Sequence, residues 1–386
     1  MKFSIFQNSI SALIPKLVNV QKLKELLIIV LKLITTTWLK SHFRASSLII
    51  KKTSKSLSTA THLHHHSTMS NPIDPNVDPY GYMGMVRNPD GSITRIFEIS
   101  TTTPACSNPS DSSPVLTKDI PVNESNKTWV RIFLPRKVFD SDQVEKLPVI
   151  VYYHGGGLVL LSAATTVFHE FCCKAAIEIP AVIVSMEYRL APEHRLPAAY
   201  EDCMEALQWF KTTSDEWLTK YADFSKCYLM GCSAGGNIAY HTGLRAVGCV
   251  DDLNPVKIKG LILQQPFFGG KERTSSELRL INDKVIPPCA TDIMWELALP
   301  VGVDRDHGYC NPMVGMKSEV LEQIKEQGWK ILITGSEGDP MIDRQIELAK
   351  DEKRLRDGAL VVTENGAIPA LPTKQAVQQI IAEAAA

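Results

Sequence analysis

Short runs of apolar residues recur along this chain, and each is separated from the next by a segment with helical periodicity. The apolar runs lie at residues 147–153, 181–186, 227–231, 260–264 and 329–334. The helical patterns between them lie at residues 167–179, 198–212, 236–247 and 341–356. Strands that are apolar throughout belong in a sheet buried on both faces. The alternation therefore predicts an α/β fold with a mostly parallel central sheet and helices on both faces.

Three further segments complete the predicted fold. Residues 128–134 alternate between apolar and polar at a period of two, which is typical of a half-buried strand. Residues 69–103 and 269–311 fit the alternation poorly, and we expect both to fold over the carboxyl ends of the strands as a small lid. In mostly parallel sheets, those ends carry the functional groups.

The first 68 residues differ in composition from the rest of the 386-residue chain. They contain ten Lys or Arg and one acid, Glu25, for a net charge of +9, which leaves 31 basic and 41 acidic residues, a net −10, in the remainder. An acidic body does not attract nucleic acid or anionic lipid, so neither is expected as a partner. Residues 26–34 are apolar, but they are too short for a stable membrane span and Lys32 interrupts them.

We therefore expect a basic N-terminal extension at residues 1–68 and one folded domain at residues 69–386. Three interpretations of the extension stay open: an over-extended start whose true beginning is Met69, a plastid or mitochondrial targeting peptide, or a basic helix that lies on a membrane surface. The abrupt change in composition at Met69 favours the first, and with it a cytoplasmic protein.

The cysteines bear on cofactors and on the redox compartment. All nine lie between residues 106 and 310, and none belongs to a CxxC pair. The odd number and the unpaired spacing favour free thiols in a reducing compartment. The histidines at residues 62–66 have no second set of ligands, so no metal and no other cofactor is expected.

A Gly-x-Ser-x-Gly sequence lies between a predicted strand and a predicted helix, at residues 231–235. Its two glycines permit a sharp, strained turn that lifts the Ser233 hydroxyl above the edge of the sheet, beside a helix N-terminus that favours negative charge. A plain tight turn is the alternative, but the strand–turn–helix context favours Ser233 as a nucleophile. Cys232 is expected to be a packing residue.

Three consecutive glycines, Gly155, Gly156 and Gly157, follow His154 at the end of another predicted strand. Without side chains, such a loop can turn its backbone N–H groups toward one point, and with the amide of Ala234 it can hold an oxyanion. The alternative is a structural glycine-rich turn. His154 is expected to brace the loop and not to act as a base.

A third sequence, GDPMID at residues 338–343, follows the predicted strand 329–334. An acid on the loop after a late strand suits the group that orients a catalytic base and stabilises its cation. Asp339 is the first choice, and Asp343, one turn into the next helix, is a supporting acid. This motif is weak alone and gains weight from the other two.

The sequences HGGG, YRLAPE, GCSAGGN and GDPMID, in this order, resemble the plant carboxylesterase family within the hormone-sensitive-lipase-like group of α/β hydrolases. RNPDGSITR at residues 87–95 and RDHGYCNP at residues 305–312 strengthen the resemblance to its hypersensitivity-related members. The resemblance covers about residues 69–357. It implies an α/β-hydrolase fold, small acyl esters as substrates, Ser233 as nucleophile and Asp339 as acid. It also implies oxyanion donors at Gly156, Gly157 and Ala234.

One expected group is missing. In this fold the catalytic histidine follows the acid, but no histidine follows His307 in this sequence. The family places it in a Gly-x-His turn about thirty residues past the acid, after a last strand that corresponds here to residues 359–363. Ile368 then occupies the expected position, and isoleucine cannot accept a proton. His169, His241 and His307 are poor replacements, since two lie in predicted helices and the third in the predicted lid.

Three hypotheses remain open from the sequence. The favoured one is a carboxylic ester hydrolase of small hydrophobic esters with a defective C-terminal sequence and impaired activity. The second is a non-hydrolytic ligand-binding receptor, lyase or cyclase on the same fold. The third is a pseudoenzyme without a ligand. The apolar segment after the glycine loop, residues 158–168, is the basis for a hydrophobic small-molecule substrate.

Overall fold

The computed structural model describes residues 78–96, 102–108, 110–142, 145–314, 318–352, 359–363, 377–378 and 381. The chain divides into two units, residues 1–68 and 69–386, and all the described residues lie in the second. The basic extension and Ile368 lie outside the described residues, so the predictions made for them stay predictions.

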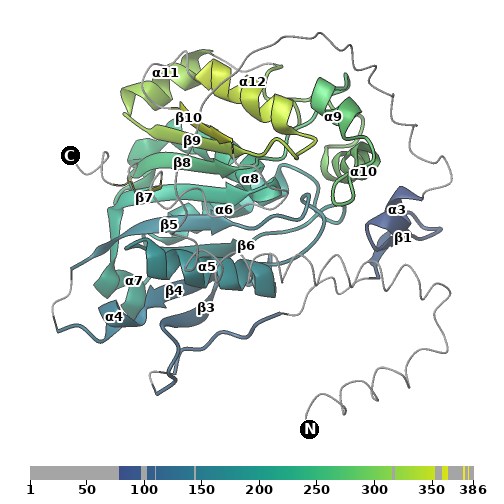
Figure 1. The fold of residues 1–386 in the computed structure, drawn as a ribbon. Helices are drawn as coiled ribbons and strands as arrows, with labels where there is room; N and C mark the ends of the chain where they lie inside the picture. The colour runs from purple at the N-terminus through teal and green to yellow at the C-terminus, as the bar shows by residue number, and fades with distance from the viewer. Residues whose placement is uncertain are drawn as a thin grey trace, which may run out of the picture. The chain divides into compact units, whose positions relative to one another are not determined.

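An eight-stranded sheet runs through the described part of the chain in the order β10-β9-β8-β7-β5-β6-β4-β3 (Figure 1). Its strands are β3 (Val115–Asn123), β4 (Thr128–Pro135), β5 (Leu147–Tyr153), β6 (Val182–Glu187), β7 (Ala222–Cys232), β8 (Ile258–Gln264), β9 (Lys330–Gly335) and β10 (Ala359–Thr363). The six strands from β10 to β6 are parallel, while β4 and β3 pair in antiparallel fashion at the other edge. The predicted mostly parallel sheet is confirmed.

Both faces of the sheet are buried because its central strands are apolar on both sides. In β5, Val149, Val151 and Tyr153 enter one core, while Ile150 and Tyr152 enter a second core on the opposite face. Successive side chains of a strand point to opposite faces, so an apolar strand requires helices on both. This requirement explains the layered arrangement of the unit.

Helices cover the two faces as the sequence predicts (Figure 1). Helix α5 (Thr166–Glu178) packs in the core that contains Ile150 and Tyr152. Helices α6 (Ala198–Trp209) and α8 (Ala234–Val247) pack in the other core. The other helices described between residues 110 and 352, apart from those of residues 269–311, are α4 (Arg136–Phe139), α7 (Glu216–Tyr221), η2 (Val250–Leu253), α11 (Ser318–Glu326) and α12 (Ile342–Glu352).

The two segments that did not fit the alternation form small elements outside the sheet. The first contains α3 (Pro79–Tyr82) and a two-stranded antiparallel sheet of β1 (Met85–Arg87) and β2 (Ile93–Arg95). The second contains α9 (Ser275–Arg279) and α10 (Pro288–Ala298). They touch each other, because α3 packs against α10 and the Tyr82 hydroxyl lies 3.5 Å from the Asp283 carbonyl oxygen. We refer to residues 269–311 as the cap segment.

The carboxyl ends of four neighbouring parallel strands meet at one edge. In the register of the sheet, Tyr153 of β5 pairs with Gly231, Cys232 with Gln264, and Gln264 with Thr334 of β9. The residues that follow these strands therefore come together, although they are far apart in the sequence.

Candidate active site

Ser233 occupies a strained turn between β7, which ends at Cys232, and α8, which begins at Ala234. Its backbone has φ 55° and ψ −117°, a region that residues with a Cβ rarely adopt. The turn is so tight that a Cβ on Gly231 would come within 2.0 Å of the Gly235 carbonyl oxygen. Glycine is therefore required beside a half-buried serine that the turn presents at the edge of the sheet.

The backbone of Ser233 is fixed from three sides. Its N–H donates to the Gln264 carbonyl at 2.8 Å, at the end of β8. Its carbonyl accepts from the N–H groups of Asn237 at 3.1 Å and Phe267 at 2.9 Å. Strain at a non-glycine residue persists only where its surroundings over-determine it, and these bonds are such surroundings. The N-terminus of α8 also gives the turn a positive partial charge.

The glycine loop after β5 lies directly against Ser233. A Cβ on Gly155 would stand 3.5 Å from the Ser233 Cβ and 3.1 Å from the Cys232 carbonyl oxygen. Gly156 and Gly157 have φ of 122° and 61°, and a Cβ on Gly156 would lie 2.0 Å from the Leu160 carbonyl oxygen. The three glycines thus shape a backbone-lined wall beside the serine.

His154 braces this loop from beneath. It is fully buried, its Nδ1 lies 2.7 Å from the Gly155 carbonyl oxygen, and its ring stacks on Tyr188 at 4.2 Å between centroids. The Tyr188 hydroxyl donates to the His154 carbonyl at 2.8 Å. Burial lowers the pKa of His154 to about 4, so the ring is neutral near pH 7. Its contacts agree with the bracing role that the sequence predicts.

The segment after the glycine loop is held by Glu187, the last residue of β6. The Glu187 carboxylate accepts from the Ser162 hydroxyl at 2.8 Å and from the Ala163 N–H at 2.6 Å. Leu158 and Leu161 adopt φ of 69° and 74°, both left-handed. Two strained leucines in a fixed segment indicate that its shape is set before any ligand binds.

Asp339 follows β9 and is buried, with 4% of its surface exposed. Its Oδ1 accepts from the Met341 N–H at 2.9 Å, and its Oδ2 from the Gln345 side-chain amide at 2.7 Å. The amide of Gln265 lies 3.4 Å from the same Oδ2. Burial raises the pKa of the Asp339 carboxyl, and the three hydrogen bonds oppose that rise by stabilising the carboxylate.

One strand separates the strand before Ser233 from the strand before Asp339. Ser233 follows β7 and Asp339 follows β9, with β8 between them in the sheet. Gln265, which follows β8, bridges the gap: its N–H donates to the Thr334 carbonyl of β9 at 2.8 Å, and its side chain approaches Asp339. The structure therefore brings the serine, the glycine loop and the acid to one edge of the sheet.

The histidines named as replacements for the base are engaged elsewhere. His169 lies 3.2 Å from Arg131 Nη1 and 3.5 Å from Cys173 Sγ, beside the antiparallel edge of the sheet. His241 Nε2 lies 3.3 Å from the Tyr309 carbonyl oxygen. The Tyr309 N–H donates to His307 Nδ1 at 3.2 Å. The position expected for the base, Ile368, is not among the described residues.

Comparisons with known proteins decide the family. A family model described as alpha/beta hydrolase fold matches residues 150–368, which is more than half of the chain, and a model described as steryl acetyl hydrolase matches residues 22–258. Carboxylesterase 20 of Arabidopsis thaliana is 54% identical over 74% of this chain and 88% of its own length. The chain belongs to the plant carboxylesterase family of α/β hydrolases. The 3-O-acetylpapaveroxine carboxylesterase CXE2 of Papaver somniferum is also similar, at 47% identity over 71% of this chain and 87% of its own length.

Solved structures share the fold of this chain. An esterase of Pyrobaculum calidifontis superposes with a TM-score of 0.57 at 27% identity, over 71% of this chain and 86% of that one. The carboxylesterase EstE1, from a metagenomic library, superposes with a TM-score of 0.54 at 23% identity, over 70% of this chain and 87% of that one. The predicted α/β-hydrolase fold is confirmed.

Two glutamines, Gln265 and Gln345, contact Asp339 in this carboxylesterase family member, and neither was predicted from the sequence. Gln265 had a local signal, because it directly follows an apolar strand and precedes Pro266, but a lone glutamine there has no distinctive chemistry. Gln345 lies about one turn into α12, and only the folded turn directs its amide to the Asp339 carboxylate. All nine cysteines are free thiols in the structure.

Two negative findings hold for the described residues alone. Within them, no helix is long and apolar enough to cross a membrane. Among the same residues, no group of three or more His, Cys, Asp or Glu side chains is arranged to hold a metal ion.

Proposed function

We propose that this chain is a carboxylic ester hydrolase in which Ser233 attacks the carbonyl carbon of small hydrophobic esters. The observation that carries the proposal is the strained turn at Ser233, which presents a half-buried hydroxyl beside the glycine loop. Strain of this kind is retained where a nucleophile must stand clear of the sheet. Membership of the carboxylesterase family supports the same reaction class.

In the proposed reaction the Ser233 oxygen bonds to the ester carbonyl carbon and passes its proton to water, which takes the place of a catalytic base. The C–O bond to the alcohol then breaks, and the alcohol takes up a proton from water. A second water attacks the acyl carbon, the bond to the Ser233 oxygen breaks, and the carboxylic acid leaves while the serine regains its proton. The N–H groups of Gly155, Gly156, Gly157 and Ala234 are the proposed donors to the oxyanion that forms between these steps. The closeness of Gly155 to the Ser233 Cβ supports this assignment.

Asp339 is the proposed acid that would orient a catalytic base. No histidine follows Asp339 in the sequence to act as that base. The match to the α/β-hydrolase family model extends to residue 368, so Ile368 falls within the matched span, at the position proposed for the histidine. Loss of a triad base typically removes on the order of 10⁶ of the rate and leaves about 10³–10⁴ over water. We therefore propose a slow hydrolase for the sequence as given.

We propose that the substrate is a short-chain ester of a hydrophobic alcohol, with acetyl as the first choice of acyl group. Two relatives carry acetyl esters in their names, a steryl acetyl hydrolase family and the 3-O-acetylpapaveroxine carboxylesterases. Buried Leu158 and Val159 and half-buried Leu161 follow the glycine loop, and Met294 of α10 packs on Gly157. Such a wall suits an apolar ester with a small acyl group.

The test is p-nitrophenyl acetate turnover by the purified chain beside a Ser233→Ala control. We expect the parent chain to turn over p-nitrophenyl acetate faster than Ser233→Ala does, and a fluorophosphonate probe to label Ser233. Equal turnover in the two proteins, together with an unlabelled Ser233, would rule out hydrolysis by this polypeptide.

A non-hydrolytic ligand-binding role is the second candidate, and the absence of a histidine after His307 favours it. A binding protein could use the same edge of the sheet without a base. It would bind p-nitrophenyl acetate or its products without turnover, and Ser233→Ala would leave that binding unchanged.

A further inference from the structure

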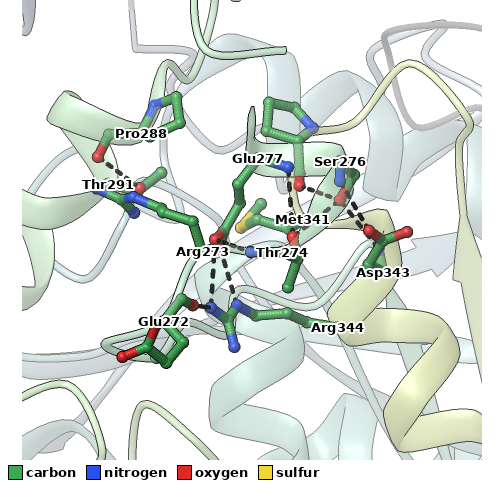
Figure 2. A network of polar contacts seen from close by, with 12 residues as sticks. Glu272, Arg273, Thr274, Ser276, Glu277, Pro288, Thr291, Met341, Asp343 and Arg344 are labelled. Carbon is green, nitrogen blue, oxygen red and sulfur yellow. Dashed lines mark hydrogen bonds and ion pairs between the residues drawn. The ribbon is translucent and has the colours of Figure 1, made fainter. Parts of the chain in front are cut away.

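The turn that carries Asp339 is tied to the cap segment by one buried hydroxyl. The Ser276 Oγ, on the first turn of α9, donates to the Pro340 carbonyl oxygen at 2.7 Å across 64 positions of sequence. Ser276 is fully buried. Figure 2 shows this part of the cap facing the start of α12, with Ser276 beside Asp343 and Glu277 beside Arg344.

This hydrogen bond reaches the Asp339 carboxylate through one peptide group. The Pro340 carbonyl and the Met341 N–H belong to the same planar unit, so fixing one end fixes the other. The Met341 N–H donates to Asp339 Oδ1 at 2.9 Å. A hydrogen bond to the carbonyl also polarises the N–H and strengthens its donation.

Ser276 is itself held beside the turn that carries Asp339 by reciprocal contacts with Asp343. Its N–H donates to Asp343 Oδ2 at 2.7 Å, and the Asp343 N–H lies 3.3 Å from the Ser276 Oγ. Next to it, Glu277 pairs with Arg344 at 2.8 Å, and both side chains are buried. Glu277 also closes a capping box with Thr274 (Figure 2). The Thr274 Oγ1 lies 3.1 Å from the same Ser276 Oγ. Contacts from both segments therefore hold the Ser276 side chain beside Pro340.

We propose that Ser276 of the cap segment is a positioning residue for Asp339, acting through the Pro340–Met341 peptide. The meaning of this role for catalysis rests on the proposed function, in which Asp339 is the acid. These contacts fix α9 of the cap segment against the turn that carries Asp339. Asp343, a supporting acid in the sequence, acts by holding Ser276.

Loss of the Ser276 hydroxyl should change the pKa of Asp339. Burial raises the pKa of this carboxyl, and the bond from the Met341 N–H counters the rise. Removing the Ser276 hydroxyl frees the peptide and weakens that bond, so the pKa of Asp339 should rise further. Ser275 provides a matched control, because it occupies the preceding position of the same helix and is exposed.

The experiment is a pH titration by NMR of the full chain labelled with ¹³C at the aspartate carboxyl carbons. The Asp339 resonance is assigned by its loss in Asp339→Asn. The expected result is a higher titration midpoint in Ser276→Ala, a midpoint restored toward that of the parent in Ser276→Thr, and no change in Ser275→Ala. If Ser276→Ala does not fold, Ser276→Cys, a weaker donor, should raise the midpoint to a smaller extent.

An unchanged midpoint in a folded Ser276→Ala or Ser276→Cys protein would overturn the proposal, and so would an equal shift in Ser275→Ala. The titration does not depend on hydrolysis. A parent chain that fails to turn over p-nitrophenyl acetate would overturn the proposed function, while the titration would still decide the positioning of Asp339.

Discussion

Gly157 lies so close to Met294 that a Cβ on the glycine would come within 2.1 Å of the methionine sulfur. Gly157 belongs to the glycine loop after β5, and Met294 lies on α10 of the cap segment. The cap therefore packs directly on the wall proposed to hold the oxyanion, and we expect the acyl group of an ester to lie beside this contact.

This contact predicts that Met294→Ala shifts the preference toward longer acyl chains. The truncation opens space beside the loop, and it should cost about 2–5 kcal/mol of unfolding free energy, as for other buried Met→Ala changes. The measurement is the ratio of kcat/KM for p-nitrophenyl hexanoate to that for the acetate, which should rise.

Leu297→Ala is the control for this change, since Leu297 is buried on the same helix. It should lose comparable stability and keep the ratio of the parent. A ratio that rises equally in both variants would mean that a loosened cap, and not the space beside Gly157, sets the preference.

The strain at Ser233 predicts that Ser233→Gly is more stable than Ser233→Ala. Both lack the hydroxyl, but only glycine adopts φ 55° and ψ −117° without steric cost. Strained backbone of this kind costs on the order of 1–3 kcal/mol, and glycine loses part of that gain through the entropy of the unfolded chain. Urea unfolding should therefore favour the glycine variant by about 1 kcal/mol. Equal stabilities would show that the turn is not strained.

Buried His241 predicts a loss of stability on the acid side. Burial lowers the pKa of His241 in the folded protein to about 3, from the ordinary value of 6.5. The unfolded chain therefore binds the proton first, and the contribution to stability is full above pH 6.5 and falls as the pH drops toward 3. At pH 4.5 the loss should be about 2–3 kcal/mol relative to pH 7.

The check is urea unfolding at several pH values between 4.5 and 7 for the parent and for His241→Gln, whose amide can still donate to the Tyr309 carbonyl. The glutamine variant should lose less stability as the pH falls. The exposed His194→Gln is the control and should follow the parent. Parallel curves for the parent and His241→Gln would contradict the assignment.

Periodicity predicted most of the sheet because its central strands are apolar throughout. The predicted strand 147–153 coincides with β5, and the end of β8 was predicted at Gln264. Strand β3 was missed, since Lys118, Asp119 and Pro121 interrupt its apolar pattern. It lies at the antiparallel edge, where polar residues and proline are tolerated.

The site was predictable only where its chemistry is local in sequence. Ser233, the glycine loop and Asp339 each sit in a short motif next to a strand, and the fold brings them to one edge as expected. The link from Ser276 to Pro340 spans 64 positions, and neither residue has a distinctive pattern. Such a contact arises from the packing of α9 on the acid turn, which periodicity does not encode.

The absent base leads to the strongest prediction. If Ile368 stands at the histidine position of an otherwise complete site, Ile368→His should accelerate ester hydrolysis. Because a missing triad base costs on the order of 10⁶, even an imperfectly placed imidazole should raise the rate by at least about 10²-fold. Ala367→His, one position away, is the matched control and should give no comparable gain. Adding Asp339→Asn to Ile368→His should remove most of the gain, since the acid orients the base.

The most direct measurement is the kcat for p-nitrophenyl acetate of Ile368→His beside the parent chain and Ile368→His/Ser233→Ala. We expect the kcat of Ile368→His to exceed that of the parent by at least about 10²-fold, and this gain to disappear in Ile368→His/Ser233→Ala. A folded Ile368→His protein that turns over at the rate of the parent, or one whose gain survives the loss of Ser233, would contradict it.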